Sequence, residues 1–454
     1  FLSYWIIPIF LTNDYHNVSF WDPVWKFDSY GWRLTMDRLL NGELFDWGRF
    51  PTLTMLVFVG IFVSIASDYF AFALLFIFWL LLYFGRTTWG GLIDLVPGMS
   101  EFHISRFIVG LHLAGLFLVP IAISWVVSLL PKRFSLFSYL FIGIFVYFAI
   151  YPQTIRYAQH NDFLIRQANE MYKKDEPDLD ILFATLKELP PGRIYAGRGG
   201  NWGKDFKVAE TNYFMHLSTY GLPLVLWLPE TWSPNSDIEQ YFNEEYASHY
   251  ALFGIRYIVT PPSVNPQPFW KFLKETPTWK LYTSDVKDVR TSEVNSGYIT
   301  SGVRPAIVSS SKLNYINVVR LWIQSDTHEK DLYPEITFTK DFPRKTGIPN
   351  FRMLDEVTYQ VPDKSTHNLF AEPPVYMSDT KPSVRIVSQS QEADMIFKAK
   401  VEVGDNCTEC IVILKQSFHP NWSATIDGQP MQTLSVSPSS SPSWLRQAPT
   451  TSFS

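Results

Sequence analysis

Five apolar stretches lie within the first 151 residues of this 454-residue chain, and this crowding restricts its possible folds more than any other feature. They cover residues 1–11, 51–66, 69–84, 107–130 and 134–151. A membrane-spanning helix needs roughly 20 mostly apolar residues, so the run at 107–130 is long enough by itself, and the runs at 51–66, 69–84 and 134–151 are near the lower limit. Soluble core helices could explain one short run. Four successive runs rich in Phe, Leu and Ile, with Trp and Tyr near their ends, favour membrane helices.

The first run begins without a methionine and, with residues 1–11, is too short to cross a bilayer. We therefore expect a fragment that begins within a truncated membrane helix and continues with about four spans. The loop at 131–133, Pro-Lys-Arg, carries two positive charges and no negative one. Because positive charge in short loops marks the cytoplasmic side, the sequence predicts a multi-pass protein of the cell membrane with residues 152–454 outside the cytoplasm.

Charged residues separate two parts of the chain. Residues 1–151 contain 8 Lys plus Arg and 9 Asp plus Glu, against 30 and 34 in the remainder. The formal net charge of −5 gives no reason to expect the basic face that nucleic acid favours. The composition therefore predicts a membrane region in contact with the lipid bilayer, an aqueous region, and no nucleic-acid partner.

Alternating helix and strand patterns follow the apolar part. Helical spacing of apolar residues at 181–189 gives way to a short strand at 193–196. The same order recurs as a helix at 238–253 and a strand at 255–260. Because helices and strands in this order bury one another's apolar faces, we expect an extracytoplasmic α/β domain over residues 152–376.

The apolar pattern changes to period two near the C-terminus. Apolar and charged residues alternate over 397–403, a buried strand is expected at 411–414, and Asp427-Gly428 is a turn signal. Short strands tied by turns predict a small β-sandwich over residues 382–434. The tail at 435–454 consists mostly of Ser, Pro and Thr and has no strand pattern. It is either a naturally disordered terminus or the product of a reading-frame error.

Three phrases carry a family resemblance. They are LVPGMSEFHISRF at 95–107, ALFGIRYIVT at 251–260 and SFHPNWSATIDG at 417–428. In this order they resemble phrases in the C-terminal half of large bacterial and archaeal membrane proteins of the YfhO type. These proteins belong with the GT-C glycosyltransferase superfamily, and relatives are labelled as membrane proteins related to 6-pyruvoyl-tetrahydropterin synthase. The chain departs from that pattern at its end, where the Ser/Pro tail replaces a closing strand and a Gly-His turn.

The resemblance implies an enzyme that transfers sugar from a polyprenyl-phosphate-type donor to a glycan or lipid acceptor during assembly of the cell envelope. By the same analogy a divalent cation could be the cofactor, although the sequence contains no visible site for one. In that superfamily the catalytic carboxylate usually lies on the first exterior loop, after the first span. That region is absent here, so the catalytic residue is unknown.

Sugar transfer is the leading interpretation, and the alternative belongs to a different class of function. A non-catalytic, membrane-anchored envelope protein would use its exterior domains to bind glycan or a protein partner. The chain has 16 Trp and 17% aromatic residues, and flat aromatic faces stack on sugar rings, although ordinary packing accounts for most Trp residues. A transporter is a third alternative, which we place last because no charged pathway lines the apolar runs.

Residues 1–151 contain few side chains that could take part in catalysis or ligand binding. Glu101, His103 and Arg106 lie on one predicted exterior loop, where the guanidinium could hold a lipid phosphate and a carboxylate or imidazole could move a proton. We favour the simpler interpretation that Arg106 and Glu101 lie among lipid headgroups. Asp14 and Asp22, on the loop after the first run, are further candidates for a catalytic carboxylate, although loop carboxylates are common.

Two other features invite a functional interpretation. His112 lies inside the longest apolar run, where an ionisable group is either functional or satisfied by a neighbouring helix or water. The stretch at 197–204 is rich in glycine and follows a predicted strand. Trp202 occupies the last glycine position of GxGxxG, and Lys204 has the wrong glycine spacing for a P-loop, so we predict a turn.

The only two cysteines, Cys407 and Cys410, form a CxxC between two predicted strands. Zinc normally needs four ligands, and neither a second CxxC nor a clustered His pair completes a site, so we predict no metal. A local disulfide and two free thiols are the alternatives. An oxidising exterior favours the disulfide.

Overall fold

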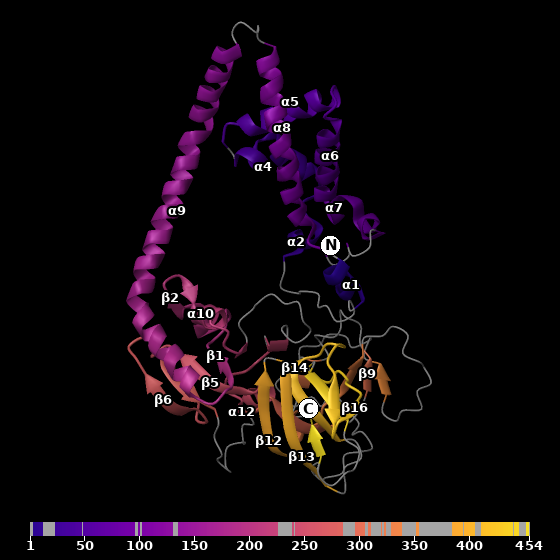
Figure 1. Cartoon of the computed structure of the whole chain (residues 1–454), viewed down its shortest axis with the longest axis vertical. Helices are drawn as coiled ribbons and strands as arrows, with labels where there is room; N and C mark the ends of the chain where they lie inside the picture. Colours follow the sequence, from indigo (N-terminus) through magenta and orange to yellow (C-terminus); the bar gives the residue numbers. More distant parts are fainter. Residues whose placement is uncertain are drawn as a thin grey trace. The chain divides into compact units, whose positions relative to one another are not determined.

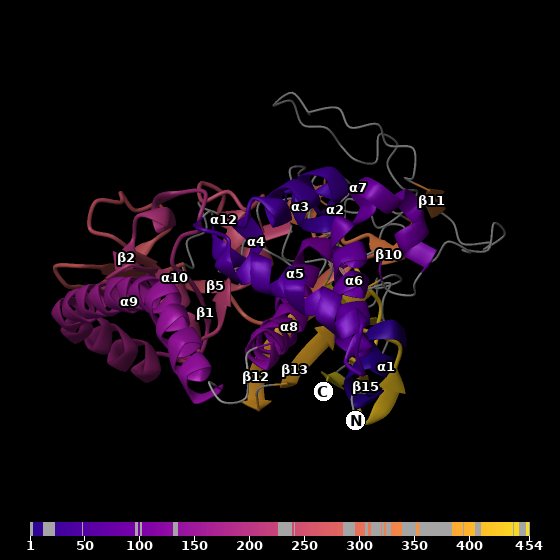
Figure 2. The same cartoon turned by 90° about the horizontal axis from the view of Figure 1, so that it is seen from above.

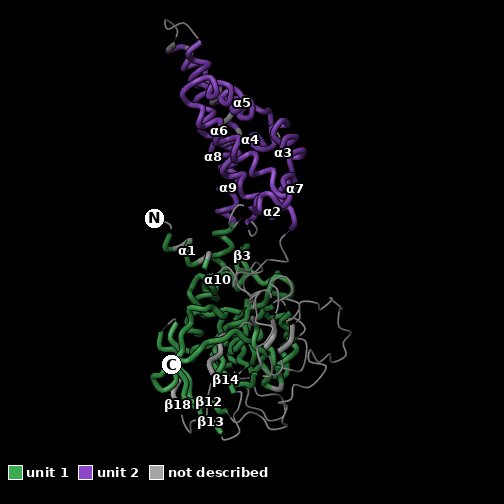
Figure 3. Tube along the Cα trace, turned by 90° about the vertical axis from the view of Figure 1, so that its right-hand side faces the viewer, with its two compact units in different colours: residues 1–19, 168–454 green, residues 20–167 purple. Residues whose placement is uncertain are grey.

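The computed structural model divides the chain into two compact units (Figures 1 and 3). The helical unit contains residues 20–167, and the larger unit contains residues 1–19 and 168–454. The structure describes residues 3–11, 23–47, 49–95, 99, 102–129, 135–225, 238–239, 241–284, 296–304, 307–309, 319, 322–323, 328–337, 351–353, 384–393, 395–404, 410–438, 440–444 and 451–453.

The helical unit consists of short helices packed on a longer one. α5 (Thr52–Ile65) and α6 (Phe70–Phe84) both pack against α8 (Ile108–Ser128), as the view in Figure 2 also shows. At Gly60 a Cβ atom would lie 2.2 Å from the carbonyl oxygen of Leu118, so glycine allows α5 and α8 to approach closely. Other described elements of this unit are α2 (Val24–Asp28), α3 (Gly31–Leu40), α4 (Glu43–Asp46), α7 (Arg86–Trp89), η2 (Gly90–Leu95) and η4 (Ile104–Phe107).

The predicted multi-pass helical membrane domain is wrong. Among the described residues, one helix over Ile104–Ser128 is long and apolar enough to cross a membrane. A second candidate exists only if Phe70–Phe84 and Arg86–Leu95, which are bent by 76° at their junction, count as one span. The run at 51–66 forms the 14-residue α5, which is about 21 Å long against a hydrocarbon core of about 30 Å.

The bend after α6 has a local cause. Gly85 has a φ of 70°, and a Cβ atom at this position would lie 2.1 Å from the carbonyl oxygen of Asp28. Glycine adopts this left-handed conformation without steric cost, so the chain turns sharply where a longer span would have continued. The loop at 131–133, on which the predicted orientation depends, lies outside the described residues.

α9 (Ser135–Glu188) is a single helix of 54 residues. The apolar run at 134–151 supplies its first part, and the helix predicted at 181–189 is its last part. Pro152, where we expected the aqueous region to begin, lies inside the helix without ending it. The division between the compact units falls further along α9, between Gln167 and Ala168. The first apolar run contributes the short α1 (Ser3–Leu11).

The α/β layer of the larger unit is a five-stranded mixed sheet with the order β4-β1-β5-β7-β6. β4, β1 and β5 are parallel, whereas β7 is antiparallel to β5 and to β6. Its elements are β1 (Arg193–Tyr195), β2 (Lys207–Val208), β3 (Thr211–Asn212), α10 (Tyr213–Thr219), β4 (Leu224–Val225), α12 (Ala247–Phe253), β5 (Ile255–Thr260), β6 (Lys271–Glu275) and β7 (Lys280–Thr283).

Apolar cores cover both faces of this sheet. One contains buried residues from the C-terminal part of α9, including Leu182 and Leu186, and the other contains residues of α12, including Tyr250 and Phe253. The strand predicted at 255–260 is present as β5. The helix predicted over 238–253 is shorter, because α12 begins only at Ala247.

The second layer of the larger unit consists of two β-sheets that share an apolar core. Along β13 the burial alternates as the sequence pattern predicts: Phe397, Ala399 and Val401 are buried, whereas Lys398 and Lys400 are exposed. The sheet orders are β12-β13-β18-β15-β16 and β17-β14-β8. The strands are β8 (Ile299–Val303), β12 (Val384–Ala393), β13 (Ile396–Val403), β14 (Cys410–Ser417), β15 (Ala424–Ile426), β16 (Gln429–Met431), β17 (Ser440–Trp444) and β18 (Thr451–Phe453).

Two features of this layer differ from the sequence expectation. β8 lies in the region expected to be α/β, yet it pairs with β14 of the β-layer. The tail expected to lack strands contributes β17, which pairs with β14, and β18, which pairs with β13 and β15. Backbone pairing with neighbouring strands explains this, since a ladder needs no apolar side-chain pattern. A further three-stranded sheet contains β9 (Ile307–Ser309), β10 (Glu335–Thr337) and β11 (Phe351–Met353).

Candidate functional site

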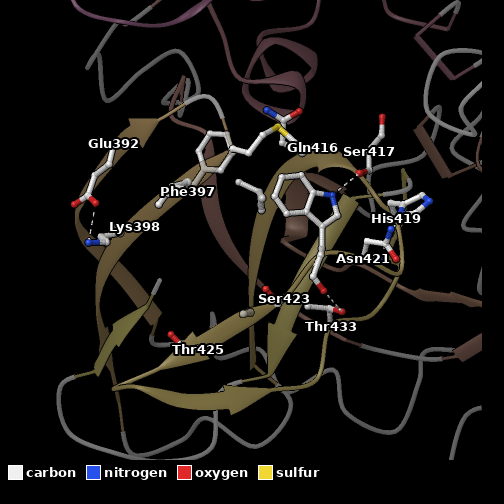
Figure 4. A pocket seen from close by; sticks show the side chains of 15 residues that line it. Glu392, Phe397, Lys398, Gln416, Ser417, His419, Asn421, Ser423, Thr425 and Thr433 are labelled. Carbon is white, nitrogen blue, oxygen red and sulfur yellow. Dashed lines mark hydrogen bonds and ion pairs between the residues drawn. The ribbon is translucent and has the colours of Figure 1, made fainter. Parts of the chain in front are cut away.

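A cleft of about 940 Å³ lies in the β-layer, and Figure 4 shows its polar lining residues. Its walls come from β13 in one sheet, β14 in the other, and the segment that joins β14 to β15. This volume is in the range of small-molecule sites in proteins, roughly 300–1,000 Å³. The cleft is continuous with the apolar core, because Phe397, Leu414 and Ala424 line the cleft and also belong to that core.

Trp422 is the largest aromatic group in the cleft lining and is only half-buried. Its indole N–H donates to the carbonyl oxygen of Ser417 at 3.1 Å. Its backbone N–H donates to the carbonyl oxygen of His419 at 3.0 Å, and its own carbonyl oxygen accepts from the Thr433 hydroxyl at 3.2 Å. These bonds fix the indole and leave its ring available to line the cleft.

The segment around Trp422 is shaped by its own polar groups. The backbone N–H of Asn421 donates to Nδ1 of His419 at 3.2 Å, which closes a tight turn before the indole. Phe397 packs at an angle against Trp422, with 6.3 Å between ring centroids. The phrase that carried the family resemblance at 417–428 therefore forms one wall of the cleft.

Polar side chains surround the apolar part of the cleft (Figure 4). Glu392 and Lys398 form an exposed ion pair with 2.8 Å between Oε2 and Nζ. The other polar lining residues are Gln416, Ser417, His419, Asn421, Ser423, Thr425 and Thr433. An aromatic face combined with amide, hydroxyl and imidazole groups suits a ligand that has both apolar ring faces and hydroxyl groups.

No cluster of three or more His, Cys, Asp or Glu residues that could hold a metal ion occurs in the part of the chain that the structure describes. The divalent cation implied by the resemblance therefore has no ligand set among these residues. The prediction of a metal-free chain is not tested by this finding.

Of the residues predicted from the sequence as catalytic or phosphate-binding, His103 and Arg106 belong to the described part of the chain, and the backbone N–H of Arg106 donates to the carbonyl oxygen of His103 at 3.1 Å. Asp14, Asp22 and Glu101 lie outside the described part of the chain. His103 is buried, and its ring meets Phe27 edge-on with 4.3 Å between centroids. Arg106 is exposed in η4, just before α8, so its guanidinium is accessible.

His112 is satisfied by a neighbouring segment. Its Nε2 lies 2.8 Å from the carbonyl oxygen of Leu44, a geometry in which this nitrogen carries the hydrogen. Of the two interpretations that the sequence allowed, the structure therefore favours a histidine with a structural partner.

Cys410 is the first residue of β14. Cys410 is buried and disulfide-bonded, and Cys407, the other cysteine of the chain, lies outside the described residues. The disulfide bond fixes the start of β14, and Cys410 is therefore not a reactive thiol.

Sequence reasoning missed the cleft itself. Trp422 precedes a turn signal, but a single tryptophan in a strand pattern is indistinguishable from a core residue. The half-buried position of Trp422 can be recognised only when the arrangement of the two β-sheets is known.

No protein-family model, curated protein or solved structure matches this chain. The resemblance to YfhO-type proteins therefore stays a prediction.

Proposed function

We propose that the cleft of the β-layer binds carbohydrate and that the protein is a glycan-binding protein of the cell envelope. The observation that carries the proposal is the fixed Trp422 indole, which lines a cleft of about 940 Å³ together with an apolar floor and a polar rim. A sugar ring has an apolar face that stacks on an indole, and its hydroxyl groups require polar partners around that face. The cleft provides both.

The polar rim supports a neutral ligand more than a charged one. Glu392 and Lys398 neutralise each other in their ion pair, and the remaining polar lining residues are amides, hydroxyls and one imidazole. Such groups donate and accept hydrogen bonds without a net charge, which matches the hydroxyl groups of a glycan.

The experiment is titration calorimetry of the purified full chain in detergent with maltotetraose, cellotetraose and chitotetraose. We expect at least one of them to bind and Trp422→Ala to weaken that binding about ten-fold or more, which corresponds to about 1.4 kcal/mol. Phe272→Ala is the matched control, because Phe272 is an aromatic residue on β6 that is 52% exposed and does not line the cleft. If Trp422→Ala bound the same number of sugar equivalents with the same affinity as the unmodified chain, the proposal would be contradicted.

Sugar transfer from a polyprenyl-phosphate-type donor stays a prediction of the resemblance. The carboxylates on which it would depend, Asp14, Asp22 and Glu101, lie outside the described residues, so no contact of theirs supports it. Location in the cell membrane, with the larger unit outside the cytoplasm, likewise stays a prediction.

A further inference from the structure

A second group of polar side chains gathers at the carboxyl edge of the α/β sheet. β1 lies between β4 and β5, and all three strands are parallel. The chain continues from β1 to β4 on one side, whereas it continues from β5 to β6 and β7 on the other. In open α/β sheets, connections that diverge in this way leave a ligand-binding crevice at the carboxyl ends of the strands.

The carboxylate of Glu244 is fixed at this edge. The Tyr195 hydroxyl and the Asn201 amide both donate to its Oε1, and the Trp202 indole N–H donates to its Oε2 at 3.0 Å. Tyr195 is the last residue of β1, and Asn201 and Trp202 follow it in the next loop. A carboxylate can accept about four hydrogen bonds, so Oε2 retains an acceptor position. The side chain of Glu244 is also partly exposed.

The loop after β1 is held by its own residues. Oδ1 of Asn201 accepts from the backbone N–H groups of Arg198 at 2.8 Å and Gly203 at 3.0 Å. Gly197 has a φ of 79°, and a Cβ atom there would lie 2.5 Å from the Cα of Gly203. The glycine-rich stretch is therefore the turn that the sequence predicts, and two amides that could have bound a phosphate are occupied by Asn201.

Two deeply buried polar groups lie near this carboxylate. Tyr250 is 0% exposed and Trp270 is 7% exposed, and the Trp270 indole N–H interacts with the Tyr250 hydroxyl without forming a hydrogen bond of normal geometry. The Tyr250 O–H therefore has no acceptor of normal hydrogen-bond geometry among the described residues. The ring centroid of Tyr250 lies 6.4 Å from that of Tyr195 and 6.1 Å from that of Trp270. Burial and the nearby charge of Glu244 raise the pKa of Tyr250, so its hydroxyl stays protonated.

The chemistry of these groups selects the ligand. An ammonium group only donates hydrogen bonds, so it would satisfy Glu244 and leave the Tyr250 hydroxyl without an acceptor. An anion only accepts them and would be repelled by Glu244. A hydroxyl group both donates and accepts, so one hydroxyl can bridge the carboxylate and the buried donors.

We propose that the carboxyl edge of β1 and β5 is a second ligand site, in which a sugar or other polyol places one hydroxyl between Glu244 and Tyr250. The hydroxyl donates to Oε2 of Glu244 and accepts from the phenol of Tyr250. The site stands independently of the cleft that Trp422 lines.

Titration calorimetry with the same three tetrasaccharides separates the two sites. The unmodified chain is expected to bind two equivalents of tetrasaccharide. The Trp422→Ala chain is expected to bind one equivalent, at the site that contains Glu244. Adding Glu244→Gln to Trp422→Ala should weaken the remaining binding about ten-fold or more. A chain that binds one equivalent, all of it lost in Trp422→Ala, would overturn the second site and leave the cleft proposal intact.

Tyr250→Phe keeps the test valid if Glu244→Gln does not fold. Removing a buried hydroxyl whose O–H has no acceptor should leave the unfolding temperature of the ligand-free chain unchanged or higher. In the Trp422→Ala background, Tyr250→Phe should weaken the remaining ligand binding. Tyr246→Phe is the control, because Tyr246 is 54% exposed. Unchanged binding with a lower unfolding temperature in Tyr250→Phe would mean that the hydroxyl holds only an internal water, and would overturn the proposal.

Discussion

Trp279 in the α/β layer and Trp422 in the β-layer are held in the same way but covered differently. The indole N–H of Trp279 donates to the carbonyl oxygen of Asp178 at 2.7 Å, and that of Trp422 donates to the carbonyl oxygen of Ser417 at 3.1 Å. Trp279 is 0% exposed within a closed core, whereas Trp422 is half-buried and lines a cleft. One aromatic residue therefore fills its layer, and the other borders space that a ligand can occupy.

The difference comes from the elements that cover each ring. The face of the α/β sheet around Trp279 is covered by the end of α9, which contributes Leu179, Leu182 and Leu186 to the same core. In the β-layer, β15 and β16 have only three residues each, so little strand length remains to close the sheet over Trp422. Whether a tryptophan belongs to the core or lines a cleft therefore depends on how completely the neighbouring helices and strands cover its ring.

Replacing Trp279 should have the largest effect on stability. Trp279→Ala is expected to lower the free energy of unfolding of the larger unit by about 5 kcal/mol, because a large cavity forms and the Asp178 carbonyl loses its donor. Urea unfolding followed by far-UV circular dichroism measures this change. A loss below about 2 kcal/mol would mean that the core around Trp279 is less closed than its burial indicates.

Lys415 joins the two layers and makes their stability depend on pH. Its Nζ donates to the carbonyl oxygen of Ala251 on α12 at 2.6 Å, and the guanidinium of Arg193 on β1 donates to the Lys415 carbonyl oxygen. Burial, followed by the positive charge of Arg193, lowers the pKa of Lys415 from 10.5 to about 7. Between these two values the unfolded chain binds more protons than the folded chain, so stability rises with pH.

The expected gain between pH 7 and pH 10 is about 4 kcal/mol, since each unit of pKa difference corresponds to about 1.4 kcal/mol. Lys415→Met removes the titrating group, so the variant should lack this part of the pH dependence. Urea unfolding of both chains at several pH values measures the difference. Parallel pH profiles for the two chains would show that Lys415 keeps an ordinary pKa in the folded protein.

Local patterns in the sequence predicted some elements well. β5 follows from a run of apolar residues after a glycine, and the alternation along β13 follows from period two. The membrane domain was predicted wrongly because apolar composition says nothing about where a helix bends, and Gly85 bends the chain after only 15 helical residues. The pairing of β8 with β14 joins positions more than 100 residues apart, which no local pattern encodes.

The candidate sites were harder to predict than the elements. Glu244 has no neighbouring catalytic motif in the sequence, and its role depends on Tyr195 and Asn201, which lie more than 40 residues earlier. Buried donors such as Tyr250 look like ordinary core aromatics until their hydrogen bonds are counted. A site formed by segments that are distant in the sequence can therefore be recognised only when the three-dimensional structure is known.

Replacing Trp422 should have the smallest effect on stability and thereby sharpens the comparison with Trp279. Trp422→Ala is expected to cost only about 1 kcal/mol, because the ring is half-exposed and lines a cleft rather than a closed core. The same urea unfolding experiment measures it, with Phe272→Ala as the exposed aromatic control. A cost near that of Trp279→Ala would mean that Trp422 belongs to the closed core and that ligand binding in the cleft would have to displace it. A small cost together with weakened binding would assign the residue to the ligand, since its ring would then contribute more to the complex than to the fold.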